Sequence, residues 1–162
     1  MDQKIDHLCD VLGREARLCG DLAGVLRDEQ EAVVRLRPEA ILACLDRRES
    51  LQEELHRLAE TRRALVLEVG AAHGRPTTSA TEMLPLLSPE PQTRVRAQLR
   101  ELRRALLEAR GLGRQNQLLI GSRLDTVGDM LRALRALVPG ARYGADAQVE
   151  TPSGVDRLDR RA

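Results

Sequence analysis

Residues 3–35 read QKIDHLCDVLGREARLCGDLAGVLRDEQEAVVR, and this stretch decides the fold of the chain. Steps of three, four or seven residues place side chains on one face of an α-helix. Apolar side chains follow these steps at Ile5, Leu8, Leu12, Cys19, Leu22, Leu26 and Val33. Two acidic residues, Glu15 and Glu29, fall on the same face. The stretch therefore predicts a long helix whose apolar face carries two carboxylates.

The next stretch predicts a second helix over residues 38–69. Pro38 suits the first position of a helix, where its missing N–H costs nothing. The apolar face consists of Ile41, Leu45, Leu51, Leu55, Leu58, Leu65 and Val69. Arg48 and Arg62 are interposed on it. Because the two helices have similar lengths and a short joint, we expect an antiparallel hairpin.

Residues 70–88 interrupt the helical pattern with Gly70, Gly74, Pro76 and a Thr-Thr-Ser run. Ser79 and Glu82 have the spacing of a capping box, which predicts a short helix over residues 80–87.

A third helix is predicted over residues 89–138. Ser88 and Pro89 suit its N-terminus, and Pro139-Gly140 ends it. Beyond Gly140 the chain is polar and lacks periodicity, so we expect residues 140–162 to form a flexible tail.

These patterns predict an all-α protein, an elongated antiparallel three-helix bundle or coiled coil with a short extra helix in the 70–88 connection. Charged residues make up 31% of the chain and aromatic residues 1%, a composition typical of long helices. We expect one helical domain, residues 1–139, followed by the tail, residues 140–162.

The sequence argues against several classes of protein. Cys9, Cys19 and Cys44 are odd in number and lack C-x-x-C spacing, so they are expected to be free thiols. The N-terminus has no signal-peptide pattern, and no apolar run approaches the length of a membrane span. No metal, phosphate-binding or catalytic motif is present. We expect a soluble cytoplasmic protein that is not an enzyme and needs no cofactor.

The three predicted helices differ in the sign of their net charge. Residues 1–35 carry a net charge of −3, residues 38–69 of −2, and residues 89–139 of +5. The simplest interpretation is that the third helix packs along the acidic hairpin. Alternatively, the basic cluster Arg94, Arg96, Arg100, Arg103 and Arg104 could bind phosphates. It lacks aromatic interleaving and any nucleic-acid motif, so we expect no nucleic-acid partner.

The third helix is predicted to be about 17 residues longer than its neighbours, which leaves part of it without an intramolecular partner. An exposed amphipathic helix suits a groove formed with another helix. The segment consists of Ile120, Leu124, Val127, Met130, Leu131, Leu134 and Leu137. Two alternatives stay open: the short helix at 80–87 covers this face, or a second subunit does so in a homodimer.

Tyr143 is the only aromatic residue in the chain. It lies beyond the third helix, in a polar segment where the core does not need a ring. Its position is equally compatible with contact to another molecule and with packing on the last helical turn.

Four segments together resemble the FlgN family of flagellar type III export chaperones. The segments are Leu26–Val33, with Glu29 at its centre; Leu45–Leu51, continuing through Leu55 and Leu58 to Arg62-Arg63; Leu112–Leu119, around Asn116; and Tyr143–Gln148. The last is close to a Y-G-x-D-G-Q signature. The sequence departs from the family's pattern at Gly113, Gln117 and Ala147. The resemblance covers about residues 22–150.

The resemblance implies a function. Such chaperones bind the C-terminal helical segments of the hook-filament junction proteins FlgK and FlgL, keep them monomeric, and hand them to the export-gate component FlhA. Carried over, the cargo-binding residues would be Asn116, Ile120, Leu124, Val127, Met130, Leu131, Leu134 and Leu137. The gate-binding residues would be Tyr143, Gly144, Asp146 and Gln148. The competing interpretation is a structural coiled-coil oligomerisation or scaffold protein, which gives no reason for the tail motif.

Overall fold

The computed structural model describes residues 2–137, 142–143 and 149–150. Three long helices account for most of them: α1 (Asp2–Val34), α2 (Pro38–Ala72) and α4 (Pro89–Leu137). Between α2 and α4 lie the short helix α3 (Ala80–Met83) and a 3₁₀ turn, Leu84–Leu86. The predicted all-α class is confirmed, and the helix boundaries agree within three residues at each end.

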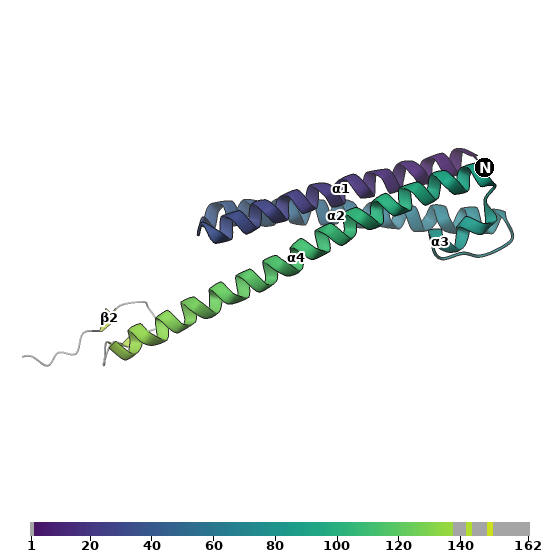
Figure 1. The fold of residues 1–162 in the computed structure, drawn as a ribbon. Helices are drawn as coiled ribbons and strands as arrows, with labels where there is room; N and C mark the ends of the chain where they lie inside the picture. Colours follow the sequence, from purple (N-terminus) through teal and green to yellow (C-terminus); the bar gives the residue numbers. More distant parts are fainter. Residues whose placement is uncertain (1, 138–141, 144–148, 151–162) are drawn as a thin grey trace, which may run out of the picture. The chain divides into compact units, whose positions relative to one another are not determined.

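By internal contacts the chain divides into two units, Met1–Leu119 and Ile120–Ala162. The predicted division after residue 139 stays a prediction. In the first unit α1 and α2 lie side by side, with the early part of α4 along them (Figure 1). Ion pairs fix the directions. Lys4 Nζ lies 2.8 Å from Glu68 Oε2, so α2 is antiparallel to α1, whereas Arg94 pairs with Asp6 at 2.7 Å, so α4 is parallel to α1.

The hairpin joint forms because α1 ends in a Schellman motif. The N–H of Arg37 donates to the carbonyl of Ala32 at 2.9 Å, and the N–H of Leu36 donates to that of Val33 at 3.3 Å. This motif needs a left-handed residue, and Leu36 supplies it with φ 52°. Glycine usually occupies that position, so the sequence did not predict the motif. Pro38 then opens α2, as expected.

The main core lies where the start of α1, the end of α2, α3 and the start of α4 meet. Its buried members include Ile5, Leu8 and Leu12 of α1, Leu65 and Val69 of α2, Met83 of α3 and Val95 of α4. The predicted apolar faces of the helices supply most of these side chains. Because α3 buries Ala80 and Met83 in this cluster and the 3₁₀ turn buries Leu84 there, the 70–88 connection is an integral part of the core.

The connection wraps closely over the end of α2. Gly70 is buried, and a Cβ there would lie 2.3 Å from Thr77 Oγ1 and 2.7 Å from the Arg75 carbonyl oxygen. Thr77 is itself buried and donates a hydrogen bond to the Val66 carbonyl at 3.3 Å. Only glycine leaves room for this approach. Ser79 caps α3 as predicted, since its hydroxyl accepts from the N–H of Glu82 at 3.2 Å.

A second, smaller cluster lies further along the bundle. Ala23 and Leu26 of α1 pack there against Ala109 of α4, with Leu22 and Leu112 at its edge.

The described part of the second unit consists of the rest of α4 and two short strands. Strands β1 (Arg142–Tyr143) and β2 (Val149–Glu150) pair antiparallel, with Tyr143 opposite Val149. The sequence did not predict this pairing.

Candidate functional site

Two ion pairs join α1 to α2, each between a buried glutamate and a partly exposed arginine. Arg62 Nε donates to both oxygens of Glu15, at 2.8 and 3.1 Å. Arg48 Nη1 donates to Glu29 Oε1 at 3.1 Å. Both glutamates are buried, with 3% and 1% of their surface exposed. The glutamates are fourteen residues apart on one helix and the arginines fourteen apart on the other, so both pairs belong to a single antiparallel register.

The Glu29–Arg48 pair is also hydrogen-bonded to a residue of α4. The Nδ2 of Asn116 donates to Glu29 Oε2 at 2.8 Å and to the Leu26 carbonyl oxygen at 2.7 Å. Asn116 is 2% exposed. We call Glu29, Arg48 and Asn116 the polar triad; it connects all three long helices within the first unit.

Burial also affects the pKa of Glu15 in the Glu15–Arg62 pair. Desolvation raises the pKa of the Glu15 carboxyl above its ordinary value of 4.5, although the neighbouring Arg62 guanidinium acts in the opposite direction. The three cysteines are free, and burial raises the pKa of each thiol. Such thiols are poor nucleophiles at neutral pH. Neither the Glu15–Arg62 pair nor the three cysteines have the arrangement of a catalytic site.

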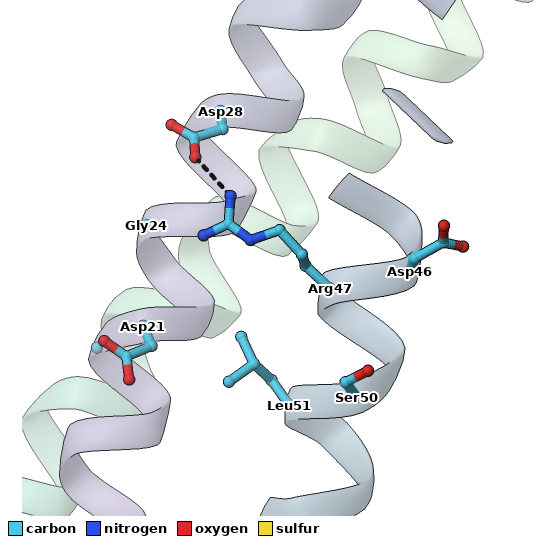
Figure 2. Close-up of a pocket in the computed structure, with 8 residues that line it drawn as sticks. Asp21, Gly24, Asp28, Asp46, Arg47, Ser50 and Leu51 are labelled. Carbon is cyan, nitrogen blue, oxygen red and sulfur yellow. Dashed lines mark hydrogen bonds and ion pairs between the residues drawn. The ribbon is translucent and has the colours of Figure 1, made fainter. Parts of the chain in front are cut away.

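A groove of about 630 Å³ lies between α1 and α2. Figure 2 shows Asp21, Gly24 and Asp28 on one side and Asp46, Arg47, Ser50 and Leu51 on the other. Arg47 Nη1 lies 3.4 Å from Asp28 Oδ2 across it. The groove is open because no side chain projects from Gly20 or Gly24. Its lining bears more carboxylates than basic side chains. It contains no nucleophile paired with a base.

The predicted cargo residues fall into three groups. Five are exposed on α4: Leu124 (67%), Val127 (53%), Met130 (61%), Leu131 (52%) and Leu134 (57%). Ile120 is partly buried, and the side chain of Leu137 lies outside the described residues. Asn116 is different, because the triad holds its amide inside the bundle.

The predicted gate residues are described only in part. Tyr143 belongs to β1, whereas Gly144, Asp146 and Gln148 lie outside the described residues. Their role stays a prediction.

One ion pair between α4 and α1 in the first unit has the polarity expected for a basic third helix on an acidic hairpin, since Arg94 of α4 pairs with Asp6 of α1. The pair between Glu108 of α4 and Arg27 of α1 has the opposite polarity. Arg104 pairs with Glu101 within α4.

The part of the chain that the structure describes has neither a metal-binding cluster nor a membrane-spanning helix. No group of three or more His, Cys, Asp or Glu side chains there could hold a metal ion. No described helix is long and apolar enough to cross a membrane.

Comparison with known families decides the identity of the chain. The family described as FlgN protein matches residues 1–151.

This chain belongs to the FlgN family.

No significant match was found among curated proteins or among solved structures. FlgN proteins are flagellar export chaperones for hook-associated proteins, and they are not enzymes. The match runs through all three long helices and both short strands, so the helical resemblance noted in the sequence is confirmed as membership.

Sequence reasoning missed the polar triad. Periodicity placed Glu29 and Arg48 on the apolar faces of their helices, but it does not identify partners. The equal spacing of two acids on one helix and two bases on the next could have predicted the pairing.

Proposed function

We propose that this FlgN protein binds the C-terminal helical segments of FlgK and FlgL through the exposed apolar face of late α4, keeps them monomeric and delivers them to FlhA. We call Leu124, Val127, Met130, Leu131 and Leu134 the cargo stripe. One observation carries the proposal: these five large apolar side chains are more than half exposed, at helical spacing, on one helix.

The stripe suits an amphipathic helix as its ligand. Burying the exposed apolar surface releases about 25 cal/mol per Å², and a helix can cover positions separated by three, four and seven residues. Met130 adds a flexible side chain that adapts to different partners. Arg132 and Arg135 flank the stripe and favour acidic groups on the cargo, although Arg132 is also paired with Asp129.

Co-purification with the C-terminal segments of FlgK and FlgL tests this proposal. Replacing Val127, Leu131 and Leu134 with Ser should abolish capture without loss of helical content. The matched control replaces Leu107 and Leu118, which are 59% and 75% exposed on α4 but lie outside the stripe. Full capture by the triple variant, or equal loss in the control, would contradict the assignment.

Delivery is assigned to the segment around Tyr143, with Gly144, Asp146 and Gln148. An aromatic ring gives a large contact area for little loss of side-chain entropy, which suits an anchor. Tyr143→Ala should weaken binding to FlhA and leave melting and cargo binding unchanged. A melting temperature lowered by several degrees would show instead that the ring is structural.

We place the protein in the cytoplasm, where the cargo is synthesised, because its three free thiols suit a reducing compartment. The second candidate is a scaffold in which the stripe binds a second copy to form a homodimer. The same exposed stripe favours it. Sedimentation equilibrium separates the two, since a homodimer formed through the stripe should dissociate in the triple Ser variant.

A further inference from the structure

Apolar packing alone fixes the position of α4 on the hairpin only weakly. Its apolar positions recur at helical spacing from Val95 through Leu134, a pattern that continues beyond the part packed in the first unit. A shift of α4 by seven residues that brings later residues into the packed part would therefore replace one apolar face with another, with Leu102 and Leu106 at the places of Val95 and Leu99. Four of the α4 residues whose side chains are described are buried, and two of them are alanines, Ala105 and Ala109, whose single methyl groups project little into a neighbouring helix.

Asn116 is the only polar member of these four buried residues. Its amide is held from two directions, by the Glu29 carboxylate and by the Leu26 carbonyl. Glu29 is 1% exposed, so its carboxylate depends on Arg48 and Asn116 for hydrogen bonds.

A heptad shift would break this arrangement. Seven residues of α-helix correspond to about 10 Å. The shift would bring Ala109 or Arg123 to the place of Asn116. Alanine offers no donor to Glu29. In the opposite shift, which brings Arg123 to this place, the Asn116 amide would move to the place of Ala109, among the apolar side chains of Ala23 and Leu26. The polar triad therefore distinguishes between registers that apolar packing leaves similar.

We propose that Asn116 is a positioning residue that sets the register of α4 on the α1–α2 hairpin. Single buried polar residues select the register of coiled coils in the same way, at a cost in stability. Such a cost is visible here, because no described protein group donates a hydrogen bond to the buried Oδ1 of Asn116.

The pair Glu15–Arg62 provides an internal comparison. It has the same chemistry and register as Glu29–Arg48, yet its recorded hydrogen bonds link only α1 and α2. Removing this pair weakens the hairpin without removing any contact that holds α4 in register.

The register also determines which residues of α4 are left for cargo. This consequence rests on the proposed function, whereas the register itself does not. Losing register would change which apolar residues follow the packed part of α4, so Asn116 would influence cargo binding without touching the cargo.

Spin-label distances between α1 and α4 test the proposal in the full-length chain. Cys9, Cys19 and Cys44 are first replaced with Ala, and nitroxides are attached through Arg17→Cys and Arg110→Cys, two exposed positions in the first unit. With Asn116 present we expect one narrow distance. Asn116→Leu should add a population displaced by up to about 10 Å, or broaden the distribution to that extent.

The control is Glu15→Leu, which also makes a buried polar residue apolar. It should lower stability but keep the single narrow distance. An unchanged distance in Asn116→Leu, or equal broadening in Glu15→Leu, would overturn the proposal. If Asn116→Leu does not fold, Asn116→Ala is judged by the same criterion. No cargo is present, so failure here leaves the proposed function standing.

Discussion

The Glu15–Arg62 pair allows a quantitative prediction, because removing Arg62 leaves a buried carboxylate without its partner. In Arg62→Met the hydrophobic stem is largely kept, and Glu15 is only 3% exposed. Removing one partner of a buried ion pair typically costs about 3–5 kcal/mol.

Protonation limits this cost. A carboxyl with an ordinary pKa of 4.5 can be neutralised at pH 7 for about 3.4 kcal/mol, since each pH unit is worth about 1.36 kcal/mol. We therefore expect Arg62→Met to lower the free energy of unfolding by about 2–3.5 kcal/mol at pH 7. The loss should shrink by up to about 1.4 kcal/mol for each unit of acidification towards pH 4.5.

Urea unfolding at pH 7, 6 and 5 measures this cost, with the wild-type protein measured at each pH. Glu15→Leu combined with Arg62→Met should recover stability to within about 1 kcal/mol of wild type, because neither charge remains. A cost below about 1 kcal/mol at pH 7, a cost independent of pH, or a double variant as unstable as the single one would refute the reasoning.

Three further predictions concern Leu36, Gly70 and the titration of Glu15. Leu36→Gly should raise the free energy of unfolding by about 0.5–1 kcal/mol in thermal or urea unfolding, because Leu36 holds φ 52° while 71% exposed; a loss of stability would show that its side chain matters more than its backbone. Gly70→Ala should lower the free energy of unfolding by more than about 2 kcal/mol, since the new Cβ would clash with Thr77 and Arg75. The control Gly20→Ala meets open space and should be neutral or stabilising, so equal effects of the two substitutions would contradict the packing described. Because the pKa of Glu15 is raised in the folded protein, protonation of Glu15 favours folding; this contribution to stability is fully present below pH 4.5 and is lost as the pH rises through the raised pKa. The unfolding free energy of the wild type minus that of Glu15→Gln should therefore fall as the pH rises over this window. A rise would contradict the direction of the pKa shift.

Helix lengths and boundaries were predictable because strong local signals mark them. Pro38 and Pro89 open helices, and the glycines and prolines of residues 70–88 interrupt the pattern. The motif that ends α1 was less predictable than the boundary, since Leu36 takes a backbone conformation that normally calls for glycine. Likewise, Gly70 lies within α2, although as a helix breaker it was expected to follow it.

The candidate site was predictable in one respect and not in another. Periodicity identified the apolar face of late α4, and its side chains are exposed in the structure. The resemblance carried Asn116 over as a cargo contact but could not show that Glu29 lies opposite, because partners across helices depend on tertiary register. The role of Asn116 therefore shifts from cargo contact to positioning.

Hydrogen exchange with and without the C-terminal segment of FlgK or FlgL locates the cargo on the chain. Docking of a helix on the cargo stripe should slow exchange of amides within residues 120–137, where α4 is exposed, and leave α1 and α2 unchanged. Protection confined to α1 and α2, including the groove around Gly24 and Leu51, with none in residues 120–137, would contradict the assignment of the cargo stripe.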